Sequence, residues 1–253
     1  MIDLSGFKSV KEILAHKDEI LRMKKAEVKR FAFGAPTKVL KNPIANKAME
    51  DDNEEAITRE IIGNTYLYMD SHKDVHVPGI FTKSIKENER KINHLHDHKQ
   101  SILAKVGNFE SVNEVPIKWT DLGIQKTGET ISLVGKSKIK RNLNAKVFDM
   151  YKAGEVDQHS VGMMYVKIEF AANDPSDETS FKVWEELINL IGNQYEVEKQ
   201  GYFFAVREAK LFEISAVLMG SNPLTPTKEP LKNTPNSEPP KGTQKTSFIQ
   251  FLN

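Results

Sequence analysis

Residues 142–170 limit the fold of this chain more than any other stretch, because they join a helix to a long strand through a single sharp stop. A helical pattern runs over 142–151 and ends near Gly154, since glycine readily takes the left-handed conformation that closes a helix. Beyond Gly162 apolar and polar residues alternate, which is typical of a half-buried strand. The residues predicted to share one face of this strand are Met164, Val166, Ile168 and Phe170. The pattern therefore predicts that Ser160 lies at the mouth of a strand, at a bend that Gly162 eases.

This position gives Ser160 two possible roles. A nucleophilic serine needs a fixed backbone, an exposed hydroxyl and nearby amides that stabilise an oxyanion, and a strand mouth can supply all three. Serine is also common in turns that have no catalytic role. On this segment alone both interpretations stay open.

Composition sets the outer limits of fold and function. The chain has 253 residues, enough for one large domain or for one domain with appendages. Its formal net charge of +1 provides no overall field that attracts nucleic acid or an anionic membrane, and no apolar run approaches the roughly 20 residues of a membrane span. The absence of cysteine excludes disulfides, thiolate metal sites and cysteine nucleophiles. We expect an intracellular protein, or one that acts inside a cell-made particle, with no nucleic-acid and no membrane partner.

Strand-like segments recur through the middle of the chain, and short helical patterns lie between them. The strand-like segments are 61–69, 105–109, 130–134, 163–170, 202–206 and 210–218. A capping box at Ser9 predicts a peripheral helix to about Arg30, and apolar residues at helical spacing predict a second helix over 180–191. The sequence therefore predicts a mainly β fold with flanking helices (α+β).

The same patterns divide the chain into three parts. Residues 1–56 are predicted to form the N-terminal helix and a linker, and residues 57–223 the globular domain. Residues 224–253 are rich in Pro, Thr and Lys. Such a segment cannot bury enough apolar surface to order itself, so we predict a disordered tail.

Three histidines lie at alternate positions in the segment His94-Leu95-His96-Asp97-His98. In a strand they would share one face, where neutral imidazoles can converge on a zinc ion. A second interpretation is one catalytic base with structural neighbours, and a third is a polar strand edge. The sequence offers no cysteine that would complete a metal site.

Glu213 is an acid inside an otherwise apolar strand. It is either a carboxylate on the solvent face of an edge strand or the acid of a catalytic site. A histidine base, Ser160 and an acid on three separate strands are the parts of a nucleophilic triad.

Four segments, taken in order, resemble the motifs of tailed-phage prohead (capsid maturation) serine proteases. In the first, 69–85, an Asp precedes Pro-Gly-x-Phe and a short helix. The second, 94–98 followed by Lys-Val-Gly at 105–107, resembles the catalytic histidine segment of that family. The third, 158–163, is similar to its Ser-Ile/Val-Gly-Phe/Met motif, and the fourth, 212–223, to its Glu-x-Ser-x-Val followed by Asn-Pro.

The resemblance implies a herpesvirus-protease-like fold, a mostly antiparallel β-barrel ringed by helices. It also implies Ser160 as nucleophile, His98 as base and Glu213 as the third catalytic member, with no cofactor and no metal. His98 is favoured as the base because an apolar residue, Leu95, precedes it where the family tends to be apolar. His96 is the rival.

The activity implied is that of a serine endopeptidase in the host cytoplasm, inside the assembling procapsid. Its substrates would be the scaffold protein, the major capsid protein and the enzyme itself. Two alternatives stay open: a metal-dependent hydrolase built on His94, His96 and His98, and a non-enzymatic capsid assembly or scaffold protein. The sequence leaves open whether the chain forms a homo-oligomer.

Overall fold

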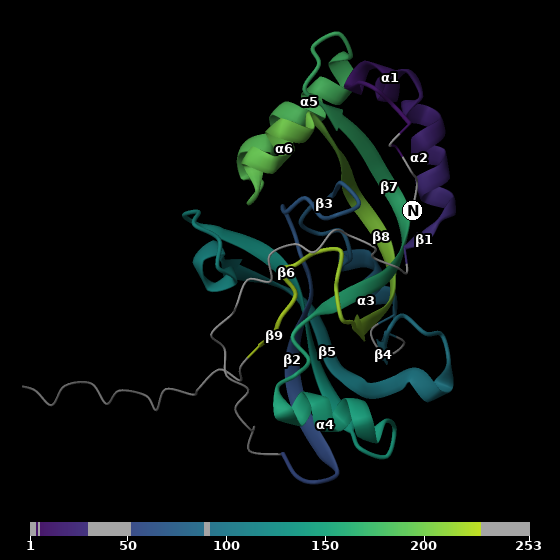
Figure 1. Cartoon of the computed structure of the whole chain (residues 1–253), viewed down its shortest axis with the longest axis vertical. Coiled ribbons are helices and arrows are strands. Elements are labelled where there is room, and N and C mark those ends of the chain that lie inside the picture. Colours follow the sequence, from purple (N-terminus) through teal and green to yellow (C-terminus); the bar gives the residue numbers. More distant parts are fainter. Residues whose placement is uncertain (1–3, 5, 30–51, 89–91, 229–253) are drawn as a thin grey trace, which may run out of the picture.

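A computed structural model describes residues 4, 6–29, 52–88 and 92–228. In this part of the chain nine strands form one twisted sheet with helices packed around it (Figure 1). The strands are β1 (Val28–Lys29), β2 (Ala56–Thr65), β3 (Asp74–His76), β4 (Asn93–His96), β5 (Lys105–Lys118), β6 (Glu129–Lys140), β7 (His159–Ala172), β8 (Tyr202–Ala216) and β9 (Thr227–Lys228). The helices are α1 (Val10–Ala15), α2 (Lys17–Ala26), α3 (Thr82–Asn88), α4 (Ala145–Ala153), α5 (Glu178–Leu187) and α6 (Gln194–Gln200), with single 3-10 turns η1 (Ile102–Ala104), η2 (Trp119–Leu122) and η3 (Ile188–Leu190).

The sheet is mixed and open. Its strand order is β1-β7-β8-β4-β5-β6-β2-β9, and β3 pairs with β8 beside this path. Most neighbours are antiparallel, but β3 and β4 run parallel to β8. A barrel closes only when its two edge strands pair with each other. Within the described residues the end strands β1 and β9 pair only with β7 and β2. The prediction of a β-rich fold with flanking helices is therefore confirmed, whereas the closed antiparallel barrel is wrong.

β8 pairs with three strands, more than any other strand of the described sheet. Along one edge it pairs with β7 over its full length. Along the other edge β3 pairs with residues 204–206 and β4 with residues 213–216. The two strands predicted at 202–206 and 210–218 are thus one strand. The residues between them belong to the same ladder with β7, which continues through the register shifts at this point.

One of these register shifts explains why the predicted face of β7 is half wrong. Val166 is an extra residue in β7, since Tyr165 and the residue after Val166 pair with consecutive positions of β8. An extra residue inverts the alternation of side chains beyond it. Ile168 and Phe170 face the core as predicted, but before the bulge the core-facing residues are Met163 and Tyr165.

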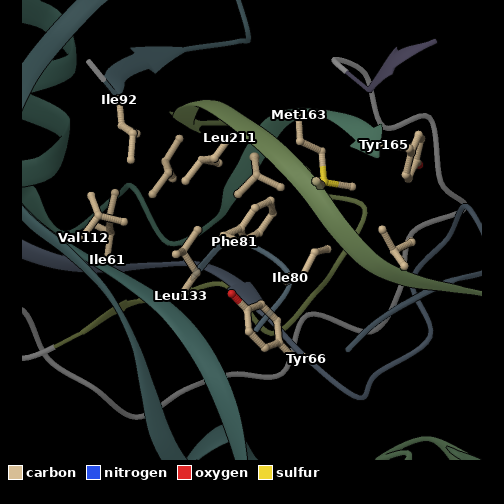
Figure 2. Close-up of a cluster of buried hydrophobic side chains, with 14 of the residues drawn as sticks. Ile61, Tyr66, Ile80, Phe81, Ile92, Val112, Leu133, Met163, Tyr165 and Leu211 are labelled. Carbon is tan, nitrogen blue, oxygen red and sulfur yellow. The ribbon is translucent and has the colours of Figure 1, made fainter. Parts of the chain in front are cut away.

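The main hydrophobic core fills the space where the twisted sheet folds over on itself, so that β2 packs against β7. Figure 2 shows Phe81 in the middle of this cluster, with Ile80 and Leu133 beside it. The turn before them contains Gly79 at φ 89°, a left-handed conformation that strongly favours glycine. The Pro-Gly-x-Phe segment of the first motif therefore serves to insert two apolar side chains into the core.

The helix stop predicted at Gly154 is present, because Gly154 caps α4 with φ 79°. The single N-terminal helix predicted by the sequence is instead two helices, α1 and α2, which meet at His16. The predicted cap at Ser9 is present: its hydroxyl accepts the amide hydrogen of Glu12 at 3.3 Å. In the described part of the chain no helix is both long and apolar enough to cross a membrane.

Residues on both sides of the predicted domain, 57–223, pack against it. Ile13 and Ile20, on α1 and α2, belong to the main core, and the amine of Lys24 lies 2.8 Å from a carboxylate oxygen of Asp74 beneath it. The N-terminal helices are therefore part of the domain, because their apolar residues complete its core. At the other end β9 pairs with β2, so the domain extends at least to Lys228. The remainder of the predicted tail, 229–253, lies outside the described residues.

Candidate active site

The ends of four neighbouring strands lie side by side along one edge of the sheet, and the predicted catalytic residues lie there. Lys105, Leu95, Ser215 and Ser160 form one row across β5, β4, β8 and β7. Because β4 is parallel to β8 and antiparallel to β5, β4 and β8 end at this edge while β5 and β7 begin there. The turn that follows β4 carries His98.

His98 reaches the site through a tight turn. Immediately after His96, the last residue of β4, Asp97 and His98 both have φ of 53°, which is uncommon for residues other than glycine. The amide of Asp97 donates to the carbonyl of Ala216 at 2.9 Å, and the amide of His98 donates to Ser215 Oγ at 3.1 Å. Strained conformations of this kind cost about 1–3 kcal/mol each and persist where the surroundings hold them. Here the end of β8 holds the turn and directs the imidazole back over the sheet.

His98 and Glu213 form a buried pair. The distance between His98 Nδ1 and Glu213 Oε1 is 2.5 Å, and the side chains are 5% and 4% exposed. The hydroxyl of Ser215 lies 2.7 Å from Glu213 Oε2. Because Ser215 Oγ accepts the His98 amide, its one hydrogen is donated to the carboxylate. Glu213 Oε2 is therefore an acceptor, and because an ionised carboxylate also accepts at Oε1, His98 Nδ1 is the donor of the pair.

Gly162 provides the space that Glu213 occupies. Gly162 pairs with Glu213 across β7 and β8, and a Cβ atom at this position would lie 2.0 Å from Glu213 Oε1. Any other residue would push the carboxylate away from His98. The sequence interpretation of Gly162 as a residue that eases a bend is thus replaced by a steric role within the strand.

Ser160 lies beside this pair, on the neighbouring strand. It is the direct cross-strand partner of Ser215, and side chains at such positions share a face with Cβ atoms about 4.5–5.5 Å apart. Among the described residues no hydrogen bond engages the Ser160 hydroxyl or His98 Nε2, and neither atom is fully enclosed. The structure therefore places Ser160, His98 and Glu213 on one face of the sheet, with the hydroxyl and Nε2 still available.

A chain of buried hydrogen bonds ties the same strands together on the opposite face. His159 Nδ1 donates to the carbonyl of Thr225 at 2.9 Å, so its Nε2 accepts from the hydroxyl of Tyr151 at 2.8 Å. The Tyr151 oxygen in turn accepts from His94 Nε2 at 3.0 Å, and His94 Nδ1 accepts from the hydroxyl of Ser137 at 2.8 Å. The carbonyl can only accept, so this one group fixes the direction of every bond in the chain.

Burial keeps both imidazoles of this chain neutral. Desolvation, with a smaller contribution from the nearby His159, lowers the pKa of His94 from 6.5 to about 3. Desolvation likewise lowers the pKa of His159 to about 4. The pKa of Tyr151 is raised well above its usual value by the same cause. His94 is therefore a structural residue that braces the strand leading to His98.

The three histidines of 94–98 do not converge on one point. His94 belongs to the buried chain of hydrogen bonds described above. His96 Nδ1 lies 3.1 Å from Asp97 Oδ2, and His98 contacts the carboxylate of Glu213. Across the described ranges, one group has ligand atoms close enough to share a metal ion: Asp70, Asp74 and His76. The histidine cluster thus lacks the geometry that a metal-dependent hydrolase would need.

Sequence reasoning assigned no role to Ser215 and missed the steric role of Gly162. A signal for both was present, because alternate residues of a strand share a face. The spacing of Glu213 and Ser215 puts a hydroxyl beside the acid, and a glycine two residues after Ser160 leaves that face open. Comparison of the chain with protein-family models, with curated proteins and with solved structures found no match.

Proposed function

We propose that this chain is a serine endopeptidase in which Ser160 is the nucleophile, His98 the general base and Glu213 the carboxylate that orients the base. The observation that carries this proposal is the buried pair of His98 Nδ1 and Glu213 Oε1 at 2.5 Å, next to a serine on the adjoining strand. A carboxylate on one ring nitrogen fixes the tautomer and leaves the other nitrogen to accept a proton.

In the first half of the reaction His98 Nε2 takes the hydroxyl proton of Ser160 while Oγ bonds to the carbonyl carbon of a peptide. The resulting imidazolium gives this proton to the leaving nitrogen as the C–N bond breaks. The products of this half are an amine and an ester of Ser160. The charge of Glu213 stabilises the imidazolium throughout.

In the second half water replaces the amine. His98 Nε2 takes a proton from the water as the water oxygen bonds to the ester carbon. The proton then passes to Ser160 Oγ as the C–Oγ bond breaks, which releases a carboxylic acid and restores the enzyme. Every step uses side chains of this chain and water alone.

The substrates proposed are scaffold protein, the major capsid protein and the enzyme itself, in the host cytoplasm within the assembling procapsid. Support for them comes from the resemblance of 69–85, 94–98, 158–163 and 212–223 to prohead protease motifs. The buried pair described above supports the chemistry, whereas the motifs support the biological setting.

The test combines active-site labelling with substrate processing. Full-length protein is treated with a fluorophosphonate, which reacts with activated serines, and the modified residue is identified by mass spectrometry. The same protein is co-expressed with a candidate capsid protein, and new chain termini are mapped. We expect the label on Ser160, and we expect both label and cleavage to be lost in Ser160→Ala.

Two controls sharpen this experiment. Ser176→Ala removes a serine from an exposed turn and should change neither labelling nor cleavage. Addition of a chelator should leave cleavage intact, whereas its loss would favour a metal-dependent hydrolase. Cleavage by Ser160→Ala at the wild-type rate would refute the nucleophile assignment.

A further inference from the structure

The large apolar side chains with the highest exposure in the described chain gather at the edge that carries the candidate active site. Ile102, Leu103 and Leu218 are 88%, 80% and 88% exposed, more than any other large apolar residue of the described ranges. Leaving such side chains in water is unfavourable, because burial of apolar surface is a main driving force of folding and association. Clustered apolar exposure of this kind commonly marks a binding surface.

The first two of these residues are presented by a well-anchored turn, η1. Ser101 caps it, because its hydroxyl accepts the amide of Leu103 at 3.3 Å. At its other end Ala104 is 2% exposed and leads directly into β5. The turn is thus fixed at both ends, and its geometry directs Ile102 and Leu103 outward.

Leu218 lies at the tip of a second anchored loop, which follows β8. The amide of Val217 donates to the carbonyl of Gln158 at 3.1 Å. At the far side of the loop a Cβ atom on Gly220 would lie 2.7 Å from the carbonyl oxygen of His159, so the chain returns closely against the residue that precedes Ser160. The tip is therefore held next to the candidate nucleophile.

The two loops are neighbours. One loop precedes β5 and the other follows β8, so both lie next to the row formed by Lys105, Leu95, Ser215 and Ser160. Only β4 separates β5 from β8. Two strand spacings amount to about 10 Å. An extended peptide rises about 3.3 Å per residue, so about three of its residues span the distance from one loop to the other.

We propose that Ile102, Leu103 and Leu218 form the specificity surface of the enzyme and bind large apolar side chains of an extended peptide next to the bond that is cleaved. This inference rests on the proposed peptidase function and adds the substrate class to it. The occupant is a polypeptide in extended conformation, because the two apolar positions follow the nucleophile strand β7 along one row of strand ends, at the spacing of such a chain.

The test measures cleavage preference with full-length protein. Wild type is incubated with a library of synthetic peptides of varied sequence, and cleavage sites are mapped by mass spectrometry. Then kcat/KM is measured for the best apolar peptide and for the same peptide with serine at its apolar positions. The variants are Ile102→Ser with Leu103→Ser, and Leu218→Ser. Leu190→Ser, a half-exposed leucine of η3 at 50% exposure, is the matched control.

We expect wild type to prefer the apolar peptide about tenfold or more, the factor that apolar contacts in a binding site typically provide. The loop variants should lose this preference and cleave the serine peptide at the wild-type rate, and Leu190→Ser should retain it. Melting temperatures should stay close to wild type, because the side chains are exposed.

The outcomes separate the two proposals. Cleavage that depends on Ser160 but shows no apolar preference, or a preference that survives in both loop variants, overturns the specificity surface and leaves the peptidase intact. If wild type cleaves no peptide, or if Ser160→Ala cleaves equally well, the peptidase proposal fails and the specificity surface falls with it.

Discussion

Acid should destabilise this protein through the two buried imidazoles of the hydrogen-bonded chain. In the folded state the pKa of His159 is lowered to about 4 and that of His94 to about 3, mainly because both are buried. In the unfolded chain both return to values near 6.5. Between these values the unfolded state binds protons that the folded state does not bind. The contribution of these two histidines to the free energy of unfolding is therefore fully present above pH 6.5 and is lost as the pH decreases toward 4.

The size of this loss of stability follows from the difference between the folded and unfolded pKa values. Each pH unit over which one proton distinguishes the two states contributes about 1.4 kcal/mol, so His159 alone accounts for about 3 kcal/mol between pH 6.5 and its folded pKa of about 4. His94 adds to this loss, although the two contributions are not independent because each charge opposes the other. Such a loss is a large part of the about 5–15 kcal/mol of a typical domain.

Urea unfolding at several pH values between 7 and 4.5 measures this slope. His159→Gln cannot titrate, so its free energy of unfolding should depend on pH less steeply than that of wild type, by about 1.4 kcal/mol per pH unit. Both proteins share the same carboxylates, whose contribution cancels in the comparison. Equal slopes would refute the reasoning. Should the variant not fold, NMR titration of wild type decides, since a His159 signal that titrates near 6.5 would contradict its neutral buried state.

Three further substitutions test the site. Gly162→Ala places a methyl group 2.0 Å from Glu213 Oε1; we expect kcat/KM in a peptide assay to fall about 10²-fold or more, with little additional loss of stability in a Glu213→Ala background, and equal costs in both backgrounds would contradict the clash. Tyr151→Phe leaves two buried imidazole nitrogens without a partner, so urea unfolding should show a loss of about 1–3 kcal/mol, and an unchanged midpoint would show that the hydroxyl is dispensable. His98→Ala should reduce kcat as much as removal of the nucleophile, with the double variant little worse, whereas His96→Ala should have a small effect, and the reverse ranking would move the base to His96.

The sequence predicts elements whose signals are local. The helix stop at Gly154 and the strand that follows it are readable because capping and alternation involve residues a few positions apart. The bulges at Val166 and Phe212 are not readable, because the extra residue is defined only by the register with a distant strand. Phe212 is therefore 37% exposed, although Ile214 two residues later is fully buried.

The candidate site shows the same limit. The three residue types of a triad can be recognised one by one, yet their meeting depends on the parallel pairing of β4 with β8, which joins residues more than a hundred positions apart. The turn at Asp97 and His98 also lacks a local signal, because neither residue is the glycine that left-handed backbone favours. The conformation of this turn is explained by its hydrogen bonds to Ala216 and Ser215, which are distant in sequence.

The position of β8 between β7 and β4 has a consequence for when the proposed activity can begin. β8 is the last long strand of the described chain to be synthesised, and it must enter between β7 and β4 before His98 has an acid to face. Pairings between strands that are distant in sequence form late and slowly, and the chain emerges from the ribosome N-terminal end first. A nascent chain that already exposes Ser160 and His98 therefore has no assembled site until residue 216 has been released. In the proposed peptidase, products of premature termination that end before residue 216 lack the assembled site, so unfinished copies have no proteolytic activity.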